Sequence, residues 1–169
     1  RFVCEQPPYS MLARGIEADV LPVCRAHGVG VIPWSPLAGG WLSGRYRKGM
    51  DAPKSTRSER LPQRFDLTLP ANRAKLDAAD ALAGVAEEAG LSLIHLALGF
   101  VLRHPAITAA IIGPRTMEQL ESQLGAADID LSTEALDQID AIVPPGINLN
   151  PADAGYTPPA LADPALRRR

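Results

Sequence analysis

The hydrophobic positions of residues 1–34 predict a strand, a helix and a second strand. Residues 2–6 form a short strand-like run that two prolines stop. Residues 17–27 carry apolar positions at helical spacing, and Gly28 is expected to end that helix. Residues 29–34 are almost continuously apolar, which is typical of a strand covered on both faces in a parallel sheet.

The rest of the chain is predicted to be mainly helical. Apolar periodicity disappears in residues 39–70, where prolines alternate with arginines, so a long loop is expected there. The periodicity then returns, and it predicts helices over 71–89, 92–103, 116–127 and 132–143, with a buried strand over 107–112. The expected helix caps are Ser92, Ser132 and a capping box of Thr116 with Gln119.

This order of elements is typical of an α/β fold, in which helical crossovers join parallel strands. We divide the chain into a domain portion, residues 1–143, and a tail, residues 144–169, that is expected to wrap over the surface. An open sheet of three strands leaves both edges bare. Because Arg1 leads straight into a strand, we expect the chain to begin in the middle of a domain.

Composition narrows the class of protein. The 169 residues are 46% hydrophobic and 21% charged, as in a soluble globular domain. A bilayer span needs roughly 18 to 20 apolar residues, and no run approaches this, so we expect a cytoplasmic protein without a membrane partner. The net charge of −2 argues against nucleic-acid binding. Cys4 and Cys24 lack metal-ligand spacing, so we predict two buried reduced thiols and no metal site.

Polar or aromatic residues follow each predicted strand, where packing alone would accept valine. These strand ends are Gln6, Trp34-Ser35-Pro36-Leu37 and Gly113-Pro114-Arg115. In barrels of alternating strands and helices, functional groups sit at these ends. The last strand end precedes a helix N-terminus, whose free N–H groups and dipole attract phosphate, and Arg115 adds a formal charge. The sequence therefore predicts an anion site.

Four blocks of the sequence resemble the aldo-keto reductase family. In order they read CEQPPYSML, VIPWSPLAGGWLSGRY, STR and IIGPRTMEQLESQLGAAD. The resemblance implies the C-terminal part of a (β/α)₈ TIM barrel, from about the sixth strand onward. It is closest to the branch that includes bacterial reductases and potassium-channel β subunits, in which tryptophan is accepted in the WSPL block. It also implies NADPH as cofactor and a small carbonyl compound as substrate.

The resemblance also implies roles for individual residues. Trp34 would stack on the nicotinamide ring, and Gln6 would bind its carboxamide. Arg57 and Arg115 are the candidates for the 2′-phosphate that distinguishes NADPH from NADH. The complete predicted cofactor set is Gln6, Trp34, Ser35, Pro36, Leu37, Ala38, Gly39, Arg45, Ser55, Arg57, Gly113, Arg115, Gln119, Ser122 and Gln123. The chain departs from the family at two of these positions, Arg45 in place of lysine and Gln123 in place of asparagine.

Several of these residues have a competing structural interpretation. Trp34 is alternatively an aromatic residue of the barrel core, and Gln6 a polar group that satisfies a loop. Arg45 and Arg57 are alternatively solvated loop charges. Trp41 stays open between an exposed loop and a substrate pocket.

The catalytic aspartate, tyrosine, lysine and histidine of the family lie upstream of the sixth strand, and no segment here matches their contexts. Tyr9, Tyr46 and Tyr156 are not paired with a strand-end lysine and histidine, so we name no catalytic residue. The resemblance implies that the full-length protein is an NADPH-dependent aldo-keto reductase and that this piece alone is inactive. The alternative is a nicotinamide-binding regulatory subunit with little turnover.

Overall fold

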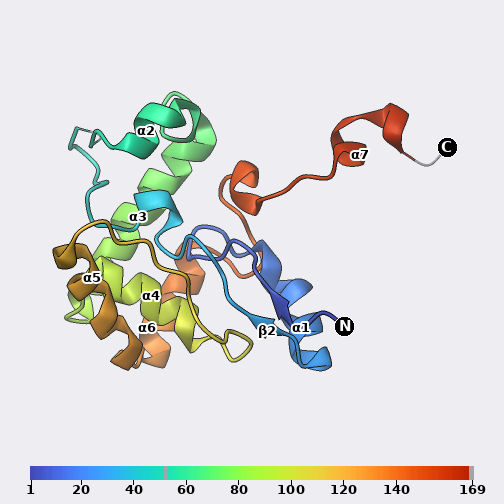
Figure 1. Ribbon diagram of the computed structural model, residues 1–169. Helices are drawn as coiled ribbons and strands as arrows, with labels where there is room; N and C mark the ends of the chain where they lie inside the picture. The colour runs from blue at the N-terminus through green and yellow to red at the C-terminus, as the bar shows by residue number, and fades with distance from the viewer. Residues whose placement is uncertain (52, 168–169) are drawn as a thin grey trace.

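A small parallel sheet lies beside a mostly helical body (Figure 1). The computed structural model describes residues 1–51 and 53–167. Strand β1 (Cys4–Glu5) pairs with β2 (Gly30–Val31) in parallel, and Cys4 stands opposite Gly30. Single bridges continue this pairing from Pro8 to Trp34 and from Trp34 to Ile111. The predicted parallel arrangement is therefore present over two short strands.

The predicted strand over residues 107–112 is wrong as a regular strand. Only the bridge at Ile111 forms, although the Thr108 and Ile111 amides donate to the carbonyls of Val31 and Pro33 at 2.8 and 2.9 Å. The Val31 amide instead donates to the Thr108 hydroxyl at 3.2 Å. A side-chain oxygen thus takes the place of the backbone acceptor, and this interrupts the ladder.

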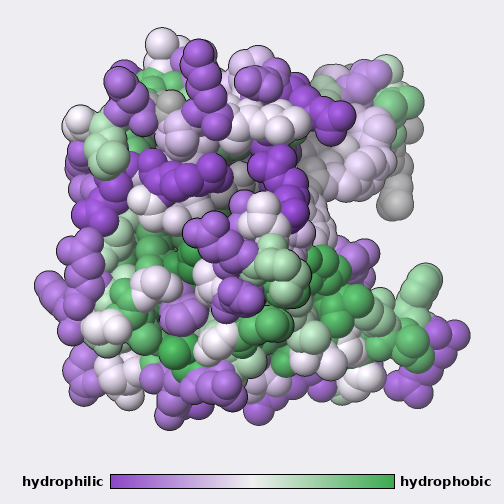
Figure 2. Space-filling model, turned by 60° about the vertical axis from the view of Figure 1, so that its left-hand side comes forward, coloured by the Kyte–Doolittle hydropathy of each residue, from purple (hydrophilic) through white to green (hydrophobic). Residues whose placement is uncertain are grey.

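The sheet is also less covered than the hydrophobic pattern predicted. Val31 and Pro33 are buried while Ile32 and Trp34 stay partly exposed, so residues 29–34 bury one face and not both. Cys24 is buried as expected, whereas Cys4 is exposed because β1 and its flanks lie at the open side of the sheet. The hydrophobic residues visible on one face of the molecule gather in its lower part (Figure 2).

The first predicted helix begins later than its pattern suggests. A 3-10 turn, η1 (Gly15–Glu17), precedes helix α1 (Val20–His27), and the Asp19 side chain accepts the first amide of α1. Gly28 ends α1 in the left-handed conformation, with φ of 63°, as predicted.

The segment predicted as a long loop contains helical turns. They are η2 (Ala38–Gly40), α2 (Thr56–Arg60) and η3 (Pro62–Arg64). Helix α2 begins with a reciprocal capping box, in which the Ser55 and Ser58 side chains each accept the other's backbone amide at 3.0 and 2.9 Å. This helix was missed because serine, and not the usual glutamate or glutamine, occupies the third helical position.

The helices of the second half form most of the core. They are α3 (Pro70–Glu88), α4 (Leu93–Arg103), α5 (Met117–Leu124), η4 (Gly125–Asp128) and α6 (Thr133–Ile142). The side chains of Ser92, Thr116 and Ser132 accept the predicted capping hydrogen bonds. Helix α4 packs against α3 and η4, and α3 packs against α6, which buries apolar residues from all four elements.

The first part of the tail packs on the helical body, and its last part does not. Residues 144–155, with η5 (Pro151–Ala154), contact the loop after β1 and helix α3. The part with α7 (Pro159–Ala162) and η6 (Pro164–Leu166) extends away from the body in Figure 1. Within the described residues, no single helix is long and apolar enough to cross a bilayer, and only α3 and α4 together, bent by 92°, meet that criterion.

Candidate functional site

The ends of the three paired segments meet at one edge of the sheet. The Trp34 amide donates to the Pro7 carbonyl at 3.0 Å, and the Tyr9 amide donates to the Trp34 carbonyl at 3.3 Å. These bonds place the chain that follows Gln6 beside Trp34. The bridge from Trp34 to Ile111 brings the segment that leads to Gly113 to the same edge. The structure therefore brings together all three predicted strand ends.

The loop after Trp34 has an unusual backbone. Ser35 and Ala38 have φ of 63° and 50°, although neither is glycine, and Gly39 has φ of 70°. The Ser35 hydroxyl accepts the Gly39 amide at 3.1 Å and so closes the turn. For residues other than glycine, here Ser35 and Ala38, such a backbone costs about 1–3 kcal/mol each, and strain of this kind clusters at functional sites. This loop carries five of the predicted cofactor residues, Ser35, Pro36, Leu37, Ala38 and Gly39.

Position 39 favours glycine for a second reason besides its positive φ, which is the close approach of Arg57. A Cβ atom at this position would lie 3.3 Å from Arg57 Nη1, which is closer than most such contacts in proteins. Glycine thus permits the Arg57 guanidinium to approach the strained loop. The two residues come from segments that the sequence separates, and both line one pocket.

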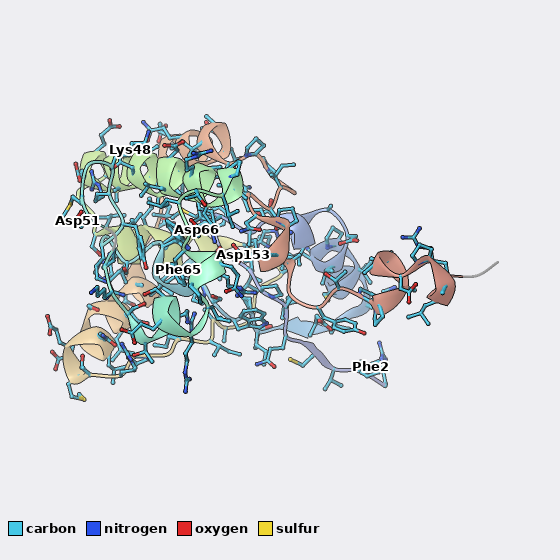
Figure 3. The ribbon with its side chains drawn as sticks, turned by 90° about the horizontal axis from the view of Figure 1, so that it is seen from above. Phe2, Lys48, Asp51, Phe65, Asp66 and Asp153 are labelled. Carbon is cyan, nitrogen blue, oxygen red and sulfur yellow. The ribbon has the colours of Figure 1, made fainter. Side chains whose placement is uncertain are left out.

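This pocket lies among the strand ends, the strained loop, the segment after α2 and the tail. Its aromatic wall consists of Tyr9, Trp34, Trp41 and Phe65, and its charged residues are Arg57, Arg64, Lys75 and Asp153. Phe65 and Asp153 lie close together in Figure 3, although the sequence separates them widely. Three cationic side chains face one carboxylate, which favours an anionic or electron-rich ligand.

Trp41 is a buried wall of this pocket and not an exposed loop residue. Its side chain is 1% exposed. Its ring stacks on Phe65 at 5.6 Å between centroids with 9° between planes, and Tyr46 lies 4.5 Å away on the same measure. Lys75 Nζ lies 4.9 Å from the centre of the Trp41 ring. Among the described residues, the indole Nε1 has no hydrogen-bond partner. The interpretation of Trp41 as an exposed loop residue is therefore wrong, and its role in a substrate pocket stays a prediction.

Lys75 and Asp153 form an ion pair that sequence reasoning missed. Lys75 Nζ and Asp153 Oδ2 are 2.9 Å apart, and the two side chains are 1% and 19% exposed. Burial lowers the pKa of Lys75, although the bond to Asp153 opposes this change. One signal was available, because Lys75 lies at helical spacing from the buried residues Ala79 and Leu82, on a stripe where an apolar residue is expected.

Arg115 lies at the start of α5, beside the segment that carries Arg57. The Arg115 amide donates to Gln119 Oε1 at 2.8 Å, so the predicted capping box with Thr116 is only half formed. The Arg115 guanidinium donates to the Thr56 hydroxyl at 3.2 Å. The structure therefore places the two arginines predicted for the 2′-phosphate on adjoining segments.

The remaining predicted residues of α5 point back to their own helix. The Ser122 hydroxyl and the Gln123 side-chain amide both donate to the Gln119 carbonyl at 2.9 Å. Gly113 is exposed and has open space where a Cβ would stand. Their roles at the adenosine end of the cofactor stay predictions.

Five further predicted residues lie outside the pocket lining: Gln6, which is exposed, Pro36, which is buried, Leu37, which is partly buried, Arg45 and Ser55. Arg45 is exposed and donates to the Ser43 hydroxyl at 3.1 Å. Ser55 caps α2 and thus supports the helix that carries Arg57. Their contacts with a cofactor also stay predictions.

Neither of the two buried tyrosines, Tyr9 and Tyr46, has an acidified phenol. The Tyr9 hydroxyl donates to Glu17 Oε1 at 2.6 Å, and burial, together with this bond, raises the pKa of Tyr9 above its usual range. Burial also raises the pKa of Tyr46, and Tyr156 is exposed. A general acid near neutral pH needs the opposite change. Within the described part of the chain, we therefore assign no catalytic acid.

Comparison with known proteins identifies the family. A sequence model described as "Aldo/keto reductase family" matches residues 1–144. The chain belongs to the aldo/keto reductase family. Members of this family fold as (β/α)₈ barrels, and the helix-rich α/β architecture with its parallel pairing is consistent with a piece of such a barrel.

Three relatives illustrate where the chain stands within the family. It is 40% identical over 162 residues to the "Uncharacterized oxidoreductase YrpG" of Bacillus subtilis. It is 31% identical over 157 residues to the "Putative voltage-gated potassium channel subunit beta" of Schizosaccharomyces pombe. It is 32% identical over 149 residues to the "L-glyceraldehyde 3-phosphate reductase" of Escherichia coli K12. The matches cover 95%, 91% and 86% of this chain, but only 44%, 44% and 42% of those proteins. The chain thus spans less than half the length of these relatives.

Proposed function

We propose that the full-length protein is an NADPH-dependent aldo-keto reductase and that this chain supplies the cofactor-binding part of its barrel. The observation that carries the proposal is the convergence of Trp34, the strained loop at Gly39 and Arg57 on one pocket, with Arg115 bonded to the neighbouring Thr56. The family and the relatives named as oxidoreductases support the reaction class. NADPH as cofactor is what the resemblance implies, and the arrangement of these residues supports it.

The residues present fit a phosphate-bearing dinucleotide. Gly39 leaves room beside Arg57 where a Cβ would crowd the guanidinium. Helix α5 begins next to Arg115, so its N-terminal amides and its dipole add to that positive charge. An aromatic platform, small residues with strained backbone and two arginines form a donor set that suits nicotinamide, pyrophosphate and 2′-phosphate respectively.

In the proposed reaction, the chemistry that NADPH would supply when bound is hydride transfer to the carbonyl carbon of a small aldehyde or ketone. Trp34 orients the ring that carries the hydride, because a flat wall of large area restricts the angle of the ring. Arg57 and Arg115 hold the phosphates and so fix the cofactor along its length. The resemblance implies that the proton for the carbonyl oxygen comes from a tyrosine upstream of this chain.

A regulatory role is the second candidate, and it rests on the relatives named as potassium-channel β subunits. In this alternative, the full-length protein would bind the nicotinamide cofactor with little turnover. The pocket described here fits both functions, since both need the cofactor. Turnover of a carbonyl substrate is what separates them.

The experiment uses the full-length protein that carries this chain. NADPH binding is followed by tryptophan fluorescence, and turnover by loss of NADPH absorbance with a panel of short aldehydes and ketones. Binding together with aldehyde-dependent oxidation supports the reductase. Binding without oxidation of any panel member supports the regulatory subunit. Absence of NADPH binding at millimolar concentration contradicts both.

A further inference from the structure

We propose that Asn72 and Lys75 are positioning residues through which the tail holds the arginine-bearing segment over the pocket. The tail strap is residues 148–155, and the arginine segment is residues 56–66, which carries Arg57 and Arg64. The inference rests on the proposed function for its effect on NADPH, while the mechanical coupling between the two segments stands on the contacts alone.

The tail strap is bonded to the body at its beginning. Asn148 Oδ1 accepts the Gly15 amide at 2.8 Å, and the Leu149 amide donates to the Leu12 carbonyl at 3.1 Å. These bonds fix the direction in which the strap crosses helix α3. The ion pair of Asp153 with Lys75 holds the strap farther along.

Asn72 joins the strap to the arginine segment with one side chain. It is fully buried, with 0% exposure. Its Nδ2 donates to the carbonyls of Gln63 and Asp66, both at 2.9 Å. Its Oδ1 accepts the Asn150 side-chain amide at 3.1 Å. The amide nitrogen of Asn72 thus binds the arginine segment, and its amide oxygen binds the tail strap, so that the hydrogen-bonding groups of the side chain are used.

Lys75 adds a second connection one helical turn later on the same face of α3. It is paired with Asp153, and it also lies over the ring of Trp41, which stacks on Phe65 of the arginine segment. Arg64 closes the arrangement, since its guanidinium donates to the Ala152 carbonyl of the strap at 3.2 Å. The two segments therefore contact each other directly and through α3.

The strap also reaches the predicted nicotinamide platform. A Cβ added at Gly155 would lie 3.3 Å from Pro8 Cγ and 3.9 Å from Trp34 Cζ2. Gly155 has φ of 88°, a conformation that disfavours any other residue. One continuous strap thus contacts the arginine segment at Ala152 and passes close to the residue expected to face the cofactor ring at Gly155.

Chain packing alone does not require these polar side chains. A buried lysine and a buried asparagine carry a desolvation cost that leucine or methionine would avoid. Such groups are retained in some proteins because they specify one arrangement of neighbouring segments. Here the arrangement they specify sets the position of Arg57 and Arg64 relative to the pocket.

The first test needs no cofactor. In the full-length protein, trypsin cleavage after Arg60 and Arg64 reports opening of the arginine segment. Asp153→Asn removes the partner of Lys75 and is expected to raise the cleavage rate about tenfold, because loss of a charge-assisted bond is felt on this scale. Asn150→Ala removes the bond to Asn72 and the cap of η5, in which Asn150 Oδ1 accepts the Ala152 amide at 3.0 Å, and it is expected to raise the rate about threefold.

The matched control is Asp77→Asn on the same helix. Asp77 pairs with Lys48 at 2.9 Å, the same distance as the buried pair, but both side chains are exposed and neither segment of the proposal is involved. We expect no change in tryptic cleavage for this variant. An unchanged cleavage rate in both Asp153→Asn and Asn150→Ala overturns the proposal, whether or not the protein binds NADPH.

The second test asks whether the coupling acts through Arg57. The dissociation rate of NADPH is measured by stopped flow for Asp153→Asn in the wild-type and Arg57→Ala backgrounds. We expect an increase of about tenfold in the first background and less than about twofold in the second, because residues that act as a unit are not additive. An equal factor in both backgrounds assigns Asp153 a general structural role and contradicts the proposal. If the wild-type protein binds no NADPH, the proposed function fails, and the cleavage test alone decides the coupling.

Discussion

Lys75 gives a prediction whose sign follows from its burial. Replacing Lys75 with methionine keeps the length of the side chain and its packing against Trp41, and removes the buried ammonium group. Asp153, which is 19% exposed, is left with access to water. Replacement of both members of a buried ion pair by apolar groups is often neutral or stabilising by about 1–4 kcal/mol, and removal of one member is costly only where the other stays buried and unpaired. We therefore expect the free energy of unfolding of Lys75→Met at pH 7 to equal or exceed that of the wild type.

The pH dependence is the sharper part of this prediction. The pKa of Lys75 is lowered in the folded state, so between this lowered pKa and the unfolded value the unfolded chain binds more protons than the folded one. Between these two pKa values, the free energy of unfolding of the wild type must therefore rise with pH relative to that of Lys75→Met. Each unit by which the pKa is lowered contributes about 1.4 kcal/mol to this rise. The advantage of Lys75→Met is thus largest at neutral pH and shrinks in alkali.

The assay is urea unfolding of both proteins at intervals between pH 7 and pH 11. The difference between them is what matters, since the buried tyrosines titrate equally in both and cancel. A difference that is flat with pH shows that the ion pair with Asp153 balances the effect of burial on the Lys75 pKa, and a difference that changes in favour of Lys75→Met as pH rises shows that the ion pair outweighs burial. Either result would refute the reasoning.

Three further predictions test the site and the fold. Arg115→Ala should weaken NADPH binding by roughly ten- to a hundredfold and leave NADH binding nearly unchanged, as measured by fluorescence titration with both coenzymes, because it removes a contact worth roughly 1.5–3 kcal/mol. Gly39→Ala should weaken NADPH binding in the same titration, since φ of 70° and the contact with Arg57 both oppose a Cβ. Ser92→Ala should cost about 1 kcal/mol in urea unfolding by removing the α4 cap, with no effect on NADPH affinity.

The elements with a local signal were predictable from the sequence. Helices α4 and α6 each combine a serine cap with an apolar stripe, and both begin at the predicted residue after Ser92 and Ser132. The third strand was not predictable in this form, because the Thr108 hydroxyl replaces a backbone acceptor and apolar composition carries no sign of that. Helix α2 was missed because its capping box uses Ser58.

Part of the candidate site was likewise predictable from the sequence, and part of it was not. The strand ends, the strained loop and the arginines lie in blocks whose order in the sequence resembles the family, so their grouping was predictable. The burial of Trp41 depends on Lys75 and, through the ion pair, on Asp153, which lies 78 residues farther along the chain. No local sequence pattern predicts a contact between a helix and a tail that are 78 residues apart in the chain. The structure was needed to show that the pocket has a wall made by the tail.

The central claim is that Trp34 forms the platform for the nicotinamide ring, and single-turnover oxidation of bound NADPH tests it most directly. The rate is compared for the wild type, Trp34→Tyr and Trp34→Leu in the full-length protein, with an excess of an aldehyde that it reduces. Stacking contributes about 0.5–1.5 kcal/mol beyond buried area, so Trp34→Leu should lose several-fold up to about tenfold in rate. Trp34→Tyr, which keeps a flat aromatic face, should retain most of the rate. If leucine supports the reaction as well as tyrosine does, Trp34 only fills the mouth of the pocket, and the claim is contradicted.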